Sequence, residues 1–161
     1  MRILAIDPGY ERLGIAVIEK NPREKEILVY SDCFKTDKRL PHAERLGLIS
    51  AEIERVTAES KPGGLAIETL FFSTNAKTAI SVAEARGAIL AVAARAGLSI
   101  YEYGPGQIKA AVTGHGQSDK DQIIAMIPRL IRVDKDIKHD DEYDAIAVGL
   151  TCFATERFST A

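Results

Sequence analysis

Four acidic residues lie at the ends of apolar segments, where carboxylates can form a metal site. Asp7 and Glu68 each follow a short run of apolar residues, and Asp141 and Asp144 open an apolar stretch near the C-terminus. Carboxylates are costly to remove from water without a compensating partner. Hard cations such as Mg²⁺ prefer oxygen ligands, and two of them can serve an in-line displacement at a phosphate. The four acids therefore indicate a divalent-cation site.

Two of these acids are expected on one face of a helix. Asp141 and Asp144 are three residues apart, and Val148 continues their face into an apolar stripe. The pair would then lie at the helix N-terminus, on the side that packs toward a sheet. Acids in a first turn also stabilise a helix through its dipole. Helix stabilisation does not explain why Asp7 and Glu68 also end apolar strands. On the residues alone, however, both a metal site and simple stabilisation of the helix remain possible.

The remaining chain predicts the elements that must position these acids. Three Ile- and Val-rich segments joined by short turn-like links are typical of an antiparallel meander. Two later strands alternate with helices, as expected for parallel strands with helices on both faces. The expected strands are 2–7, 13–19, 27–34, 65–68 and 98–103, and the expected helices are 41–60, 75–96, 105–112, 119–131 and 140–158. The sequence therefore predicts an α/β fold with a five-stranded mixed sheet. Sites in such sheets form beyond the carboxyl ends of parallel strands.

Composition favours a single cytoplasmic domain over residues 1–161. The chain is 46% hydrophobic, enough for an ordinary core, and its longest apolar run, 88–94, is too short to cross a bilayer. The N-terminus enters a strand-like run directly and lacks the layout of a signal peptide. Cys33 and Cys152 have no metal-ligand spacing, so reduced thiols are expected. We expect no membrane association.

The charge distribution gives weak support for a polyanionic partner. The net charge of −2 argues against nucleic acid at first sight. Residues 73–132, however, carry more basic than acidic side chains, and the excess of acids lies in residues 133–161. A bound metal would offset part of that acidity. A solvated surface explains the pattern about as well.

Four motifs, in order and at matching spacing, resemble the RuvC family of Holliday-junction resolvases. They are Asp7-Pro8-Gly9, Ala66-Ile67-Glu68, Glu84-Ala85-Arg86-Gly87-Ala88 and Asp141-Glu142-Tyr143-Asp144-Ala145. Each motif alone is weak, but the ordered set is specific and the resemblance spans residues 2–152. It implies a ribonuclease H-like fold and a homodimer that cuts four-way DNA junctions. It also implies one or two Mg²⁺ ions per subunit, with Mn²⁺ as a substitute, and a RuvA–RuvB-type branch-migration complex as a partner.

The resemblance assigns catalytic and metal-binding roles residue by residue. The positions that match the family's catalytic acids are Asp7, Glu68, Asp141 and Asp144. His139 and Asp140 directly precede Asp141 and are also possible ligands. We choose Asp141 because its three-residue step to Asp144 fits the motif.

The resemblance also assigns residues to DNA. Phe71 matches an aromatic residue that the family places against junction bases, and Phe72 and Asn75 belong to the same loop. Base–aromatic stacking is worth roughly 1–3 kcal/mol per base. A core position is the alternative for either Phe, although two adjacent Phe do not easily bury on one face. Lys109 and Lys120 match basic residues near the scissile phosphate, with Lys120 in the catalytic set.

The implied function is resolution of Holliday junctions in recombination and repair by paired, symmetric nicks that leave 5′-phosphate and 3′-hydroxyl ends. A non-catalytic junction-binding protein is one alternative, although all four acids are present. An actin-like phosphotransferase is another, because Asp7-Pro8-Gly9 followed by Gly14 resembles its first phosphate loop. That class needs two such domains and further phosphate loops, which 161 residues do not hold.

Overall fold

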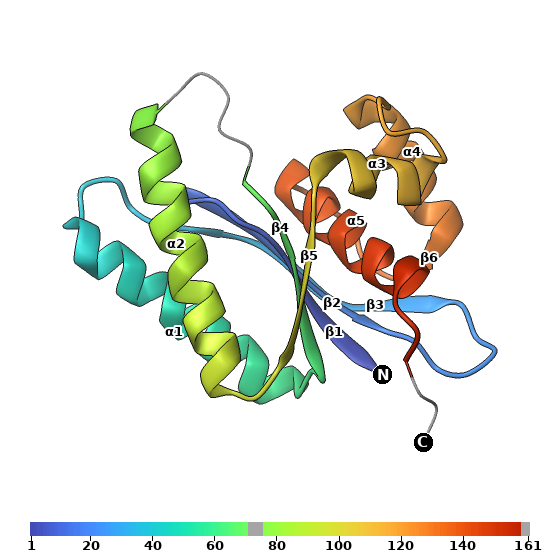
Figure 1. The fold of residues 1–161 in the computed structure, drawn as a ribbon, viewed down its shortest axis with the longest axis horizontal. Coiled ribbons are helices and arrows are strands. Elements are labelled where there is room, and N and C mark those ends of the chain that lie inside the picture. The colour runs from blue at the N-terminus through green and yellow to red at the C-terminus, as the bar shows by residue number, and fades with distance from the viewer. Residues whose placement is uncertain (71–75, 159–161) are drawn as a thin grey trace.

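A computed structural model describes residues 1–70 and 76–158, which form one mixed sheet with helices on both sides (Figure 1). The strand order across the sheet is β5-β4-β1-β2-β3-β6. The strands are β1 (Arg2–Asp7), β2 (Arg12–Glu19), β3 (Glu26–Lys35), β4 (Gly64–Glu68), β5 (Ser99–Tyr103) and β6 (Ile131–Arg132). The helices are α1 (His42–Ser60), α2 (Ala76–Arg95), α3 (Pro105–Thr113), α4 (Lys120–Leu130) and α5 (Asp140–Thr155).

The expected meander and the parallel additions to it are confirmed. Strands β1, β2 and β3 pair antiparallel, and β4 pairs parallel to β1 and to β5. The register aligns Ile6 of β1 with Ile67 of β4. Asp7 and Glu68, the residues that follow them, therefore end neighbouring parallel strands at the same edge of the sheet.

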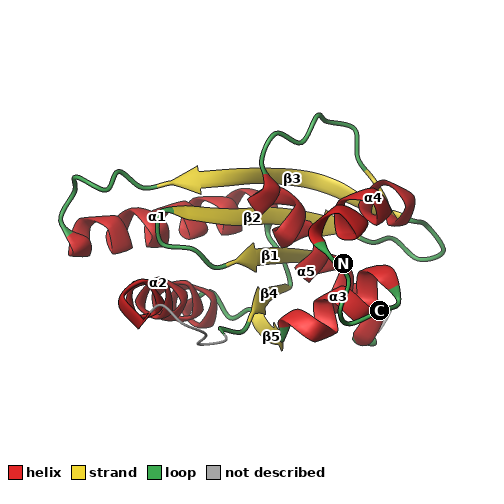
Figure 2. Ribbon diagram, turned by 90° about the horizontal axis from the view of Figure 1, so that it is seen from above, coloured by secondary structure: helices red, strands yellow, loops and turns green. Residues whose placement is uncertain are grey.

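Each face of the sheet has its own hydrophobic core, because side chains along a strand alternate between faces. Leu4 and Ile6 point to the face that α1 and α2 cover. Ile3 and Ala5 point to the opposite face, which α3, α4 and α5 cover. Figure 2 shows the two layers of helices from above, with the strands between them. The prediction of helices on both faces is confirmed.

Two glycines let α5 lie close to the strands that carry the site. A Cβ added at Gly149 would lie 2.6 Å from a methyl group of Ile18 and 3.0 Å from Cβ of Ala5. A Cβ added at Gly14 would lie 2.1 Å from the carbonyl oxygen of Asp141. Any side chain at these positions would therefore push the helix away from β1 and β2.

The prediction of five strands was wrong, because a sixth strand pairs with β3. Ile131 and Arg132 form β6, parallel to β3, with Ile131 beside Glu26. The sequence pattern instead predicts Ile131 as the last residue of the preceding helix. Pro128 lies inside the last turn of α4, where it lacks an N–H for helical bonding, and the backbone is extended at Ile131. A strand of two residues is too short to show a periodic pattern.

The last helix also ends earlier than predicted. It stops at Thr155 rather than at Phe158. The Phe158 ring packs edge-on against Tyr101 and Phe153, with centroids 5.9 Å and 5.4 Å away. The chain leaves the helix path to make these contacts. Among the described residues, no helix combines the length and apolar character needed to cross a membrane.

Candidate active site

Three of the four predicted acids line one open pocket of about 270 Å³ at the carboxyl ends of the strands. Asp7 comes from β1, Glu68 from β4 and Asp144 from α5. Lys109 of α3 and Lys120 at the start of α4 line the same pocket. Three carboxylates and two lysines that are far apart in the sequence therefore meet at the edge of the sheet where Asp7 and Glu68 were expected to lie together.

The three pocket carboxylates all favour a proton more than a free carboxyl does. Burial raises the pKa of Asp7 well above its ordinary value, and the negative charges of Glu68, Asp144 and Asp141 add to this. Burial also raises the pKa of Glu68 despite a hydrogen bond with Asp7, and Asp144 adds to the effect. Burial raises the pKa of Asp144 in spite of Lys120. The pocket therefore concentrates more negative charge than its neighbours neutralise.

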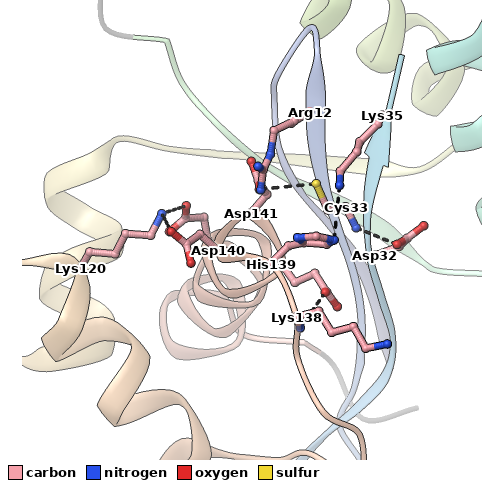
Figure 3. Close-up of polar contacts among 11 residues, drawn as sticks. Arg12, Asp32, Cys33, Lys35, Lys120, Lys138, His139, Asp140 and Asp141 are labelled. Carbon is pink, nitrogen blue, oxygen red and sulfur yellow. Dashed lines mark hydrogen bonds and ion pairs between the residues drawn. The ribbon is translucent and has the colours of Figure 1, made fainter. Parts of the chain in front are cut away.

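Lys120 supplies part of the missing positive charge. Its Nζ lies 3.0 Å from Oδ2 of Asp144. The same Nζ lies 3.3 Å from Oδ2 of Asp140 (Figure 3). Partial burial opposes its charge, but the two carboxylates outweigh burial and raise the pKa of Lys120. Asp119 fixes the start of α4 by accepting a hydrogen bond from the Gln122 backbone N–H at 2.9 Å. The lysine thus projects from a capped helix end toward the pocket.

Asp141 lies beside the pocket, with its carboxylate turned toward β2 and β3. Its Oδ2 accepts hydrogen bonds from Nε of Arg12, at 2.9 Å, and from Nη2 of the same guanidinium. The thiol of Cys33 lies 3.4 Å from this oxygen, as Figure 3 shows. Burial opposes ionisation, but the Arg12 hydrogen bonds outweigh it and lower the pKa of Asp141. The described residues that line the pocket do not include Asp141.

The two residues before Asp141 point elsewhere. Asp140 is largely exposed, with 67% of its side chain accessible, and its described partner is Lys120. His139 is the N-cap of α5, and its Nε2 lies 3.5 Å from Nζ of Lys35. Neither is among the described residues that line the pocket. The three-residue step from Asp141 to Asp144 does fall within the first turns of α5.

Three predicted DNA-contacting residues, Phe71, Phe72 and Asn75, lie outside the described residues. The strand that leads into this segment is fixed by Arg86. Its Nε donates to the Glu68 carbonyl oxygen at 3.0 Å, and its Nη2 pairs with Glu102. Arg86 lies inside one of the four motifs but received no role from the sequence.

An ion pair with a buried carboxylate, which the sequence did not predict, fixes the start of α5. Glu142 is 3% exposed and accepts hydrogen bonds from Nζ of Lys135 at 2.7 Å and from Oγ of Ser31 at 2.6 Å. Arg12, which binds Asp141, was also missed. These residues pair across long stretches of sequence, and only the position of Glu142 inside a motif could have signalled it.

The donor set fits a hard divalent cation. The four residues assigned as ligands are all carboxylates, and the excess negative charge in the pocket would be relieved by Mg²⁺ or Mn²⁺. Among the described residues, however, no three His, Cys, Asp or Glu side chains are grouped closely enough to hold one ion. Asp141 is engaged by Arg12, and Asp7 is hydrogen bonded to Glu68. The carboxylate ligands fit a divalent cation chemically, but the described side chains would have to rotate before three of them could bind one ion.

The family model and the curated relatives that match this chain all point to the same family. The family model described as "Crossover junction endodeoxyribonuclease RuvC" matches residues 3–152. The curated RuvC of Thermosipho melanesiensis is 43% identical over 156 residues, covering 97% of this chain and 98% of its own length. That of Desulfitobacterium hafniense is 43% identical over 150 residues, covering 93% and 90%.

Solved structures agree with the sequence matches. Thermus thermophilus RuvC has a TM-score of 0.86 at 33% identity, over 96% of this chain and 94% of that one. The same protein in complex with a Holliday junction substrate gives a TM-score of 0.87 over 94% and 92%. The yeast mitochondrial Holliday junction resolvase Ydc2, at 11% identity and a TM-score of 0.71, shares the fold. The expected ribonuclease H-like class is confirmed, and the chain belongs to the RuvC family of crossover junction endodeoxyribonucleases.

Proposed function

We propose that this protein resolves four-way DNA junctions during recombination and repair by paired, metal-dependent nicks. The observation that supports this most directly is the pocket in which Asp7, Glu68 and Asp144 meet two lysines. The excess of negative charge suits a metal ion, and the lysines suit phosphates. Relatives of similar length carry the name of crossover junction endodeoxyribonuclease.

Each pocket acid has a distinct place in this proposal. Asp7 and Glu68 would hold Mg²⁺ from the fixed ends of two strands, and Asp144 would hold it from α5, with Asp141 as a fourth ligand. One or two ions per subunit fit this set, and Mn²⁺ would substitute. When bound, the metal would activate a water molecule and stabilise the leaving 3′ oxygen, which gives 5′-phosphate and 3′-hydroxyl ends. The parallel pairing of β1 and β4 keeps Asp7 and Glu68 close despite their mutual repulsion.

The basic and aromatic residues would position the DNA. Lys109 of α3 and Lys120 of α4 both line the pocket, so either could contact a phosphate next to the scissile bond. Lys120 would exchange its bond to Asp144 for one to the phosphate once a metal neutralises that acid. We assign Phe71, Phe72 and Asn75 to contacts with bases and backbone at the crossover, on the strength of the family motif.

We further propose that residues 1–161 act as one nuclease domain in a cytoplasmic homodimer. One continuous sheet with a core on each face supports the single domain. A two-fold dimer would present two sites to the two-fold symmetric junction. Ile80 of α2 is 62% exposed, which fits a helix that packs against a second subunit. A RuvA–RuvB-type complex is the proposed partner for delivery of junctions.

The test is a nicking assay on a four-way junction and on linear duplex of the same sequence, with Mg²⁺, Mn²⁺, Ca²⁺ and chelator in parallel. We expect symmetric nicks in the junction with Mg²⁺ or Mn²⁺, religatable ends, and little cutting of the duplex. Tight junction binding without cleavage under every metal would support the non-catalytic alternative instead. Equal cutting of both substrates would contradict junction selectivity.

A further inference from the structure

The guanidinium of Arg12 engages a carboxylate that the proposed metal site needs. Two of its nitrogens, Nε and Nη2, donate to the same oxygen of Asp141. The Cys33 thiol lies 3.4 Å from that oxygen on the neighbouring strand. Asp141 is therefore held by groups outside the pocket (Figure 3).

The backbone of Asp141 is nevertheless placed next to Asp7. Gly14 pairs with Asp7 across the first two strands. A Cβ added at Gly14 would lie 2.1 Å from the Asp141 carbonyl oxygen and 3.2 Å from Cβ of Asp7. Asp7 and Asp141 thus flank the same glycine. Asp141 is therefore attached to the backbone close to Asp7, although its carboxylate is bound to Arg12.

Arg12 is also suited to a competing ligand. Its side chain is 49% exposed at the start of β2, whereas the Asp141 side chain is 20% exposed. A guanidinium binds phosphate with the same paired geometry as carboxylate. A partly exposed ion pair is weak, so an incoming phosphate can displace it.

We propose that Arg12 is a positioning residue that keeps Asp141 out of the metal site until a DNA phosphate takes the place of that carboxylate. The inference rests on the proposed function, because it needs a metal site and a DNA substrate. Arg12 acts through Asp141 and does not touch the reacting atoms. Arrival of DNA would then complete the ligand set, and the free protein would bind metal with fewer carboxylates.

The test measures Mg²⁺ binding in the absence of DNA by calorimetry. We expect Arg12→Gln to lower the Mg²⁺ dissociation constant roughly two- to fivefold, the factor that corresponds to a partly exposed ion pair. Arg12→Lys keeps the charge but not the paired geometry, and should lie between wild type and Arg12→Gln. Arg39→Gln is the matched control, because Arg39 pairs with Asp37 on a surface loop and should leave Mg²⁺ binding unchanged.

The same comparison in an Asp141→Asn background separates this role from a general charge effect. There, Arg12→Gln should no longer change the Mg²⁺ dissociation constant, because no carboxylate remains to be released. Equal Mg²⁺ affinity in wild type and Arg12→Gln would overturn the proposal, as would an equal gain in the Asp141→Asn background. This readout needs neither DNA nor cleavage, so the two proposals can fail separately. Failure of junction nicking would overturn the proposed function, whereas the effect of Arg12→Gln on Mg²⁺ binding would still show whether Arg12 withholds Asp141.

Discussion

At the scale of single residues, the carboxylates that the proposed metal site requires lower the stability of the metal-free protein. Asp7, Glu68 and Asp144 are held together with insufficient positive charge, and the pKa of each is raised, chiefly by burial. A carboxyl whose pKa is higher in the folded than in the unfolded protein favours folding only while it is protonated. The contribution is fully present below the ordinary pKa and is lost as pH rises through the folded pKa. At neutral pH the metal-free pocket therefore destabilises the protein.

We predict that Asp7→Asn stabilises the metal-free protein at neutral pH while it abolishes nicking. Removal of one buried charge from this cluster should raise the free energy of unfolding by on the order of 1 kcal/mol. The difference between variant and wild type should shrink as pH falls, because Asp7 becomes protonated. Chemical denaturation in chelator at several pH values measures it. Glu54→Gln removes an exposed acid and should have little effect; a destabilised Asp7→Asn would argue against charge crowding.

At the scale of elements, the site depends on how closely α5 approaches β1 and β2. Gly14 and Gly149 provide that approach, and the buried Glu142 with Lys135 and Ser31 fixes the helix start. Asp141 and Asp144 are therefore placed by contacts that involve neither a metal nor DNA. A small shift of this helix should weaken the site more than it weakens the fold.

We predict that Gly14→Ala damages both stability and metal-dependent nicking. The added methyl group would overlap the Asp141 carbonyl oxygen, so α5 must move, and overpacking of this kind costs roughly 1–3 kcal/mol. Gly47→Ala is the control, because Gly47 of α1 has open space around its Cα and gains helix propensity. Denaturation and nicking are measured for both variants. Wild-type activity in Gly14→Ala would show that helix position does not limit the site.

The elements that hold the site could largely be predicted from the sequence, because they follow short-range patterns. The Ile- and Val-rich strands end at Asp7 and Glu68, and their order along the chain implies parallel neighbours. Strand β6 could not be predicted, because a strand of two residues is too short to show an alternation of apolar and polar side chains. The orientation of Asp141 could not be predicted either, because it is set by Arg12, which is 129 residues away in the sequence.

At the scale of the whole molecule, paired nicks require two pockets that face one junction. The described chain holds one such pocket, at one edge of its sheet. In the proposed homodimer each subunit would supply one such pocket, and the two pockets together would make the paired cuts. Helix α2 is the proposed contact between subunits.

We predict that Ile80→Glu makes the protein monomeric and uncouples the two nicks. A charge at this exposed apolar position would have to be desolvated in a helix–helix interface. Sedimentation gives the oligomeric state, and supercoiled plasmids with a cruciform separate single from paired cuts. Val29→Glu alters an equally apolar exposed position on β3 and should remain dimeric. A dimeric Ile80→Glu variant would place the interface elsewhere.

We propose that the carboxylates inside the pocket hold the metal that cleavage requires, and Asp144 and Asp140 test this as a matched pair. Both pair with Lys120, but Asp144 lines the pocket and Asp140 is largely exposed outside it. The measurement is the single-turnover rate of junction nicking in Mg²⁺ for Asp144→Asn and Asp140→Asn. We predict that Asp144→Asn abolishes nicking with junction binding retained, and that Asp140→Asn stays near the wild-type rate. Near-wild-type nicking by Asp144→Asn, or an equal loss in both variants, would contradict the assignment of the pocket as the active site.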